Sequence, residues 1–180
     1  MINKEVILKL KPCQDRYDNY VTKYKDKSFT KSQFMGLKSI THFDKLWVAF
    51  RLMTKSQVIA AAADIAESVL HIFESEHPND KRPRLAIEAI RSGKGLAEAH
   101  TTAIAAANAA VKSAFYAAYA TYAVANAAYY ADDASYNIAR VACTISVTSC
   151  LSYDVDEDKK QQAKLVRKII LKHWKKEKKS

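Results

Sequence analysis

The sequence predicts an all-α protein that folds as a single domain over residues 1–180, a bundle of about six to eight helices with a core rich in Ala and Tyr. Three observations support this fold class. The 180 residues include only three Gly and three Pro, which leaves few residues for the tight turns of a β fold. Residues 97–142 contain no Gly or Pro, and Ala, the strongest helix former, is their commonest residue. This length suits one substantial hydrophobic core.

Residues 1–52 are expected to form the N-terminal helices. Apolar and aromatic residues spaced three or four apart predict a helix over residues 13–24, directly after Pro12: Tyr17, Tyr20, Val21 and Tyr24. A short helix is expected over residues 30–37. Thr41 followed by Asp44 has the form of a capping box, which predicts another helix start. The apolar face of that helix would comprise Leu46, Trp47, Phe50 and Leu52.

Residues 54–153 are expected to form the Ala-rich core of the bundle, beginning with a long helix. Thr54 and Gln57 repeat the capping pattern at its start. The apolar residues that follow step by four and three, as one helical face requires: Val58, Ala62, Ile65, Val69 and Ile72. Pro78 should end this helix, because the residue before a proline disfavours the helical conformation.

A short helix is expected next. Asn79 or Asp80 is predicted to cap its start, with Pro83 in the first turn, and Gly93 and Gly95 should end it. Its inward face is predicted to contain Leu85, Ala86, Ala89 and Ile90.

Two or three helices are expected over residues 96–151, because one helix of that length is unusual in a globular domain. The expected breaks lie near residues 112–115 and 132–135. Aromatic residues recur every seven positions across them, which predicts a tightly packed seam: Phe115, Tyr122, Tyr129 and Tyr136. Three of the few charged side chains of this run are expected to be buried: Asp132, Asp133 and Arg140. A buried charge needs a partner, and one of the two Asp side chains is expected to meet an Arg of the preceding segment.

Residues 154–180 are expected to form a basic C-terminal helix. Acidic residues at 154–158 suit a helix N-terminus, and basic residues follow toward the C-terminus. One face is apolar: Leu165, Val166, Ile169, Ile170 and Trp174. The other face is basic: Lys164, Arg167, Lys168, Lys172, Lys175 and Lys176. The net charge of +10 favours an acidic partner, so this basic face is a candidate contact for nucleic acid or for an acidic protein surface. The alternative is an amphipathic helix whose charges are simply solvated.

A charged junction is the second candidate site, lying between the long helix and the Ala-rich run: Glu74, Asp80, Lys81, Arg82, Arg84, Glu88 and Arg91. Arg84 and Glu88 are four residues apart, and Glu88 and Arg91 are three apart, so both pairs can meet on one helical face. The junction is expected to clamp the turn between two helices, with contact to an acidic partner as the alternative.

The sequence predicts no catalytic residues, no metal and no cofactor, and therefore a protein that is not an enzyme. Gly-rich phosphate loops, nucleophile elbows, paired Cys motifs and His-Glu zinc helices are all absent. A metal site that combines Asp132 and Asp133 with His100 or His71 is retained only as a remote alternative. Three Cys and no secretory signal predict reduced thiols and a soluble, cytoplasmic protein that makes no membrane contact.

Residues 80–84 read Asp-Lys-Arg-Pro-Arg, and Ala-Ile-Glu-Ala follows at residues 86–89. With Phe73, Glu74 and Pro78 before it and Arg91 after it, this segment resembles a bacterial family of Ala-rich, all-helical immunity proteins linked to polymorphic toxins. The Ala-Ala-Tyr-Tyr segment at residues 127–130 resembles the second half of that family. Family members place His residues in the Ala-rich helices, where this chain has Tyr, Asn and Asp, and the basic tail is more pronounced here. The toxin partner is therefore expected to differ.

The resemblance implies a non-catalytic inhibitor that binds and neutralises a toxin or a defence effector, of immunity or anti-defence type. The net charge of +10 favours an acidic surface on that partner. The alternative is a nucleic-acid-binding accessory protein that uses the basic C-terminal helix. Assembly into a homo-oligomer is left open by the sequence.

Overall fold

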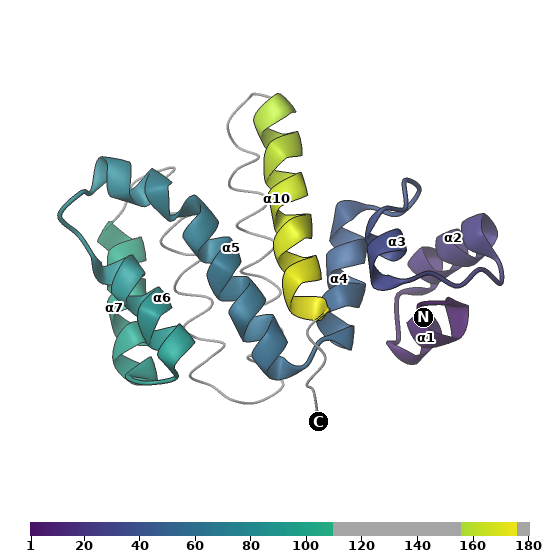
Figure 1. The fold of residues 1–180 in the computed structure, drawn as a ribbon, viewed down its shortest axis with the longest axis horizontal. Helices are drawn as coiled ribbons and strands as arrows, with labels where there is room; N and C mark the ends of the chain where they lie inside the picture. The colour runs from purple at the N-terminus through teal and green to yellow at the C-terminus, as the bar shows by residue number, and fades with distance from the viewer. Residues whose placement is uncertain (110–155, 176–180) are drawn as a thin grey trace.

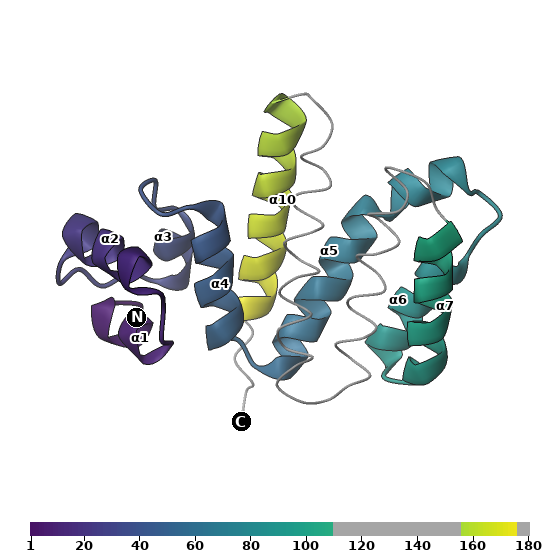
Figure 2. The ribbon, with the colours of Figure 1, turned by 180° about the vertical axis from the view of Figure 1, so that it is seen from behind.

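The computed structural model describes residues 1–109 and 156–175, and in these ranges every regular element is a helix. Eight helices are present, and the sole β pairing in the same ranges is an isolated antiparallel bridge between Ile2 and Phe29. The all-α prediction is therefore confirmed. Figures 1 and 2 show an elongated arrangement with α10 in the middle, α1 and α2 toward one end, and α6 and α7 at the other.

The N-terminal helices are α1 (Lys4–Lys9), α2 (Gln14–Tyr24), α3 (Lys31–Met35) and α4 (His42–Leu52). The last three agree with the predicted segments, and Thr41 accepts a hydrogen bond from the Asp44 backbone at the start of α4. Helix α1 was not predicted. It has six residues, Asn3 caps it, and Ile7 packs into the core. The bridge between Ile2 and Phe29 holds the N-terminus beside the start of α3.

Helix α5 (Lys55–Glu76) is the core helix of the described structure. Thr54 and Gln57 form both hydrogen bonds of a capping box at its start, and it ends one residue before the predicted limit at His77. Nine of its residues are buried, most of them Ala, Val, Ile or Leu. By length and composition α5 could also cross a membrane, but half of its apolar window is buried inside the protein, as expected of a core helix.

Helices α6 (Arg82–Ser92) and α7 (Leu96–Ala109) form a hairpin beside α5 (Figure 1). Two expectations for α6 were wrong. The N-cap residue is Lys81, and the Asp80 side chain instead accepts a hydrogen bond from the backbone N–H of Arg82, two positions later. Leu85 is 58% exposed, and Ile87 takes its place in the core because α5 lies on that side of the helix. Gly93 ends α6 with φ of 69°, a conformation that a residue with a Cβ rarely adopts.

Helix α10 (Asp156–Trp174) joins the two ends of the molecule. It packs against α5 on one side and against α3 and α4 on the other, and both views show it between α4 and α5. Val166, Ile170 and Trp174 are almost completely buried, whereas Leu165, which was predicted to share their face, is 38% exposed at its edge.

Several predictions lie outside the described residues. They concern the helix breaks at residues 112–115 and 132–135, the aromatic seam from Phe115 to Tyr136, and the charges Asp132, Asp133 and Arg140.

Candidate anion-binding groove on the last helix

The basic face of α10 lines an open groove of about 520 Å³. Its described lining residues come from consecutive turns of this helix: Lys164, Arg167, Lys168, Leu171, Lys172 and Lys175. Five of the six basic residues predicted for this face therefore share one surface, and the sixth, Lys176, lies outside the described residues. At 1.5 Å of rise per residue, the cations extend over about 16 Å of helix.

The alternation of apolar and basic residues explains this placement. Val166, Ile170 and Trp174 face the core, so Lys164, Lys168 and Lys175, on the opposite side of the helical wheel, face outward. Lys31 of α3 holds the C-terminal end of α10, because its Nζ donates a 2.8 Å hydrogen bond to the Trp174 carbonyl and lies 5.7 Å from the centre of the indole ring. A cation is favourable at the negative end of a helix dipole.

Arg167, one of the groove residues, lies near a cation of the adjacent helix α4. Its guanidinium donates a 3.5 Å hydrogen bond to the Ser32 carbonyl, and Gly36 leaves room for it, since a Cβ at Gly36 would lie only 3.2 Å from Arg167 Nη2. Burial and the charge of Arg167 both lower the pKa of Lys45 on the adjacent helix α4. The fold thus holds two like charges near each other, an arrangement that a bound anion would stabilise.

Lys172 is already paired within the protein, through a cluster that we call the Asp64 hub: Asp64, Arg91, Lys172 and His173. Asp64 of α5 lies 2.7 Å from Arg91 of α6, 2.9 Å from Lys172 and 2.8 Å from the buried His173 of α10. Burial alone would raise the pKa of Asp64, but hydrogen bonds from His173, Lys172 and Arg91 lower it to about 2. The hub therefore joins three helices through one ionised carboxylate.

Three lysines of the groove have no carboxylate partner among the described residues. In the described part of the chain, Lys164, Lys168 and Lys175 form no ion pair, and all three side chains are exposed. Closely spaced lysines without carboxylates repel one another and attract anions. The groove is therefore suited to phosphates or to the carboxylates of another protein.

The charged junction has a different arrangement from the one predicted. Arg84 forms a two-pronged ion pair with Glu74 at 2.6 and 2.7 Å, and Arg91 pairs with Glu67 at 2.7 Å. The expected pairs of these arginines with Glu88 do not form, because both guanidinium groups turn toward α5 while Glu88 is exposed.

Three other junction residues, Asp80, Lys81 and Arg82, form local contacts within the connection and the first turn of α6. Arg82 pairs with Asp80 at 2.6 Å, and Lys81 Nζ donates a 2.8 Å hydrogen bond to the Pro78 carbonyl. The junction residues are therefore mostly engaged inside the chain, between the end of α5 and the start of α6.

Sequence reasoning missed the partners on α5, although a signal was present. Glu67 and Glu74 are seven residues apart, as are Arg84 and Arg91, and two antiparallel helices bring equal spacings into register.

As for metal ligands, the described residues contain no group of three His, Cys, Asp or Glu side chains placed to share an ion. The proposed ligands Asp132 and Asp133 lie outside those residues.

No protein-family model matches this chain, and neither a curated protein nor a solved structure matches it. The resemblance to immunity proteins thus depends on the sequence alone, mainly on the segment at residues 73–91.

Proposed function

We propose that this protein is a non-catalytic inhibitor, of immunity or anti-defence type, which binds an acidic surface of a toxin or defence effector through the groove of α10. One observation carries the proposal: Lys164, Lys168 and Lys175 lie along one exposed groove and pair with no carboxylate among the described residues.

Charge complementarity is the physical basis of such binding. A row of exposed cations attracts an acidic partner at long range and increases the association rate, and it disfavours partners of like charge. The buried anchors of α10, Ile170 and Trp174, keep the row in a fixed geometry. A rigid docking surface loses less conformational entropy when it binds than a mobile one does.

The charged junction supports the same choice of surface. Its segment carries the resemblance to immunity proteins, yet Arg84 and Arg91 are already paired with Glu74 and Glu67. Breaking those pairs to bind a partner would leave the carboxylates of α5 without their cations. The junction therefore serves the fold, and of these two described surfaces the groove is the more available to a partner.

Binding to nucleic acid is the second candidate function, and the length of the groove favours it. Five cations over about 16 Å could follow several consecutive phosphates. Contacts of Lys164, Lys168 and Lys175 with three phosphates of duplex DNA would give a slope of about −2.7 in a plot of log K against log salt concentration.

The inhibitor proposal is tested by co-expressing the chain with each toxin or effector gene that adjoins its own gene. We expect one pair to form a stable complex and to restore growth. Charge reversal at Lys164, Lys168 and Lys175 (all Lys→Glu) should abolish both results. The matched control reverses three exposed lysines of the N-terminal segment and should leave both intact: Lys9, Lys23 and Lys27. Neither rescue nor complex formation with any neighbour would refute the proposal.

The two candidate functions are separated by fluorescence anisotropy with short duplex DNA and with RNA over a series of salt concentrations. Tight binding with the expected slope, lost in the groove variant and kept in the control, would favour the nucleic-acid function. An absence of binding at low salt would exclude it.

A further inference from the structure

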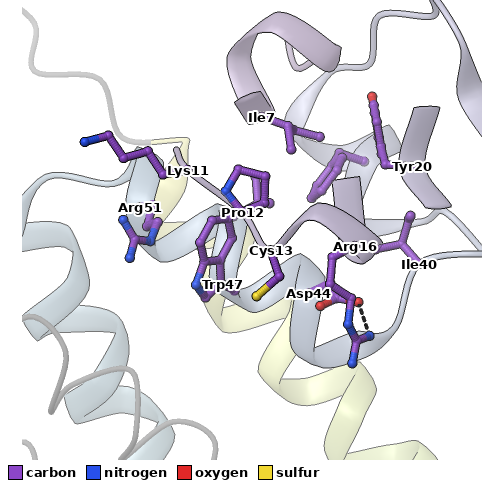
Figure 3. A pocket seen from close by; sticks show the side chains of 12 residues that line it. Ile7, Lys11, Pro12, Cys13, Arg16, Tyr20, Ile40, Asp44, Trp47 and Arg51 are labelled. Atoms are coloured by element: carbon purple, nitrogen blue, oxygen red, sulfur yellow. Dashed lines mark hydrogen bonds and ion pairs between the residues drawn. The ribbon is translucent and has the colours of Figure 1, made fainter. Parts of the chain in front are cut away.

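A second cavity, of about 410 Å³, lies between the N-terminal helices and is separate from the groove of α10 (Figure 3). It is enclosed by residues of α1, α2, α3 and α4, by the connection between α1 and α2, and by Ile40 in the connection between α3 and α4. Its apolar lining consists of Ile7, Pro12, Tyr20, Phe34, Ile40, Trp47 and Val48. The size is that of a typical small-molecule site, since such pockets measure about 300–1,000 Å³ and are lined mainly by apolar and aromatic side chains.

The floor of the cavity belongs to the hydrophobic core. Tyr20, Phe34 and Ile40 are 2%, 1% and 7% exposed, so the cavity reaches side chains that are otherwise closed to solvent. Tyr20 and Phe34 pack together with ring centres 6.4 Å apart. The indole of Trp47 forms another wall. Aromatic faces of this kind favour a flat apolar occupant.

The rim of the cavity is cationic. Lys11, Arg16 and Arg51 carry three positive charges and Asp44 one negative charge, which gives the lining a net charge of +2. Arg16 pairs with Asp44 at 2.9 Å, whereas Lys11 and Arg51 form no ion pair with any carboxylate in the described ranges. Figure 3 shows Lys11 and Arg51 on one side of Trp47 and the Arg16–Asp44 pair on the other.

One contact and one unusual backbone conformation characterise these two residues at the entrance. The guanidinium of Arg51 lies 4.6 Å from the centre of the Trp47 ring, a cation–π contact that holds it over the wall of the cavity. Lys11 has φ of 54°, a left-handed conformation that is strained for a residue with a side chain. Strained residues persist where the surrounding structure determines them and are frequent at ligand sites.

We propose that this cavity binds a small organic anion with a flat apolar body, of the class of aromatic carboxylates and sulfonates. The apolar body would contact Trp47, Phe34 and Tyr20, and the anionic group would lie between Lys11 and Arg51 at the rim. Charge complementarity selects an anion over a neutral or cationic molecule of the same shape. The proposal is independent of the inhibitor function and of the α10 groove.

The test compares two fluorescent probes of nearly the same shape, 8-anilinonaphthalene-1-sulfonate and the neutral N-phenyl-1-naphthylamine. Titration of the full chain should give one saturable site for the sulfonate, with an affinity at least about tenfold higher than that for the neutral probe. The double variant Lys11→Gln/Arg51→Gln should remove this preference and leave the affinity for the neutral probe unchanged. Both residues are exposed, so the fold should tolerate the change.

Two further variants complete the test. Lys164→Gln/Lys168→Gln removes the same charge from the α10 groove and should affect neither probe. Cys13→Phe places a ring at the rim, where the exposed Cys13 lines the cavity, and should exclude both probes. Far-UV circular dichroism confirms that each variant is folded. Equal affinity for the two probes, or an equal loss in the groove control, would overturn the proposal, as would binding that Cys13→Phe does not reduce.

Discussion

Replacing Asp64 by Asn tests whether the Asp64 hub holds α10 and α6 against the core helix. The substitution keeps the size of the side chain and removes the charge that faces Arg91, Lys172 and His173. Arg91 retains its second partner, Glu67, so α6 keeps one link to α5. The link of Lys172 to α5 loses its ionic character, His173 loses its carboxylate partner, and we expect the attachment of α10 to weaken most.

The size of the effect follows from the pKa of Asp64. In the folded protein it is about 2, compared with 3.8 for an unperturbed Asp carboxyl group. One pH unit of pKa difference corresponds to about 1.4 kcal/mol, so the folded environment favours the carboxylate by about 2.4 kcal/mol. Because Lys172 and Arg91 are themselves partly exposed and therefore screened by solvent, we expect Asp64→Asn to lower the free energy of unfolding at pH 7 by about 2 kcal/mol.

The same difference sets the direction of the pH dependence. The pKa is lower in the folded state, so the stabilisation is complete well above pH 3.8 and is lost as the pH falls toward 2. The stability difference between the wild-type chain and Asp64→Asn should therefore fall to about half of its neutral value near pH 3.

Urea unfolding followed by far-UV circular dichroism measures this difference, and urea is preferred because guanidinium salts screen ion pairs. Glu88→Gln is the matched control, since Glu88 is an exposed carboxylate on α6 without an ion pair in the described structure. It should change the stability by less than about 0.5 kcal/mol. A loss below about 0.5 kcal/mol for Asp64→Asn at pH 7, or a difference that stays constant down to pH 3, would refute the reasoning.

Three further predictions use the same unfolding assay. Thr54→Ala should cost about 1 kcal/mol, because it removes the capping hydrogen bond at the start of α5, and an unchanged midpoint would contradict the cap. Ile87→Ala should cost about 2–4 kcal/mol and Leu85→Ser less than about 0.5 kcal/mol, and the reverse order would show that α6 buries the other face. Burial raises the pKa of Tyr20 to about 12, and its hydroxyl has no hydrogen-bond partner among the described residues. Tyr20→Phe should therefore leave the free energy of unfolding at pH 7 unchanged or raise it. It should also remove the loss of stability that ionisation of Tyr20 in the unfolded chain causes as the pH rises above 10. A decrease of more than about 1 kcal/mol in the free energy of unfolding at pH 7 would indicate that the hydroxyl does have a hydrogen-bond partner.

The helix boundaries that the sequence predicted well are those fixed by local chemistry. Thr41 and Thr54 cap the helices that follow them, and Pro78 limits α5, because each effect involves residues only a few positions apart. Helix α1 was missed because six residues are too few to show a period, and its stability depends on the packing of Ile7 against distant residues. Leu85 was misplaced for a similar reason, since the position of α5 decides which face of α6 is buried.

The candidate sites divide in the same way. The basic face of α10 was predictable, because one helix supplies every described residue of the groove and the helical period alone brings these residues together. The Asp64 hub combines three helices, so it could not be assigned without knowing that α6 and α10 both lie beside α5. The cavity at Trp47 is assembled from four helices and two connections, and no spacing in the sequence marks it.

Lys172 belongs both to the groove and to the Asp64 hub, and this double membership determines how the groove would bind an acidic partner. A carboxylate or phosphate that approaches Lys172 competes with Asp64, so the new contact gains little net free energy. Lys164 and Lys168 have no described carboxylate to give up, and contacts with them should therefore supply most of the affinity. When Lys172 turns to the partner, Arg91 still neutralises Asp64, His173 stays within 2.8 Å of its carboxylate, and the apolar face of α10 remains buried. The helix can thus present its cations to a partner without being released from the core.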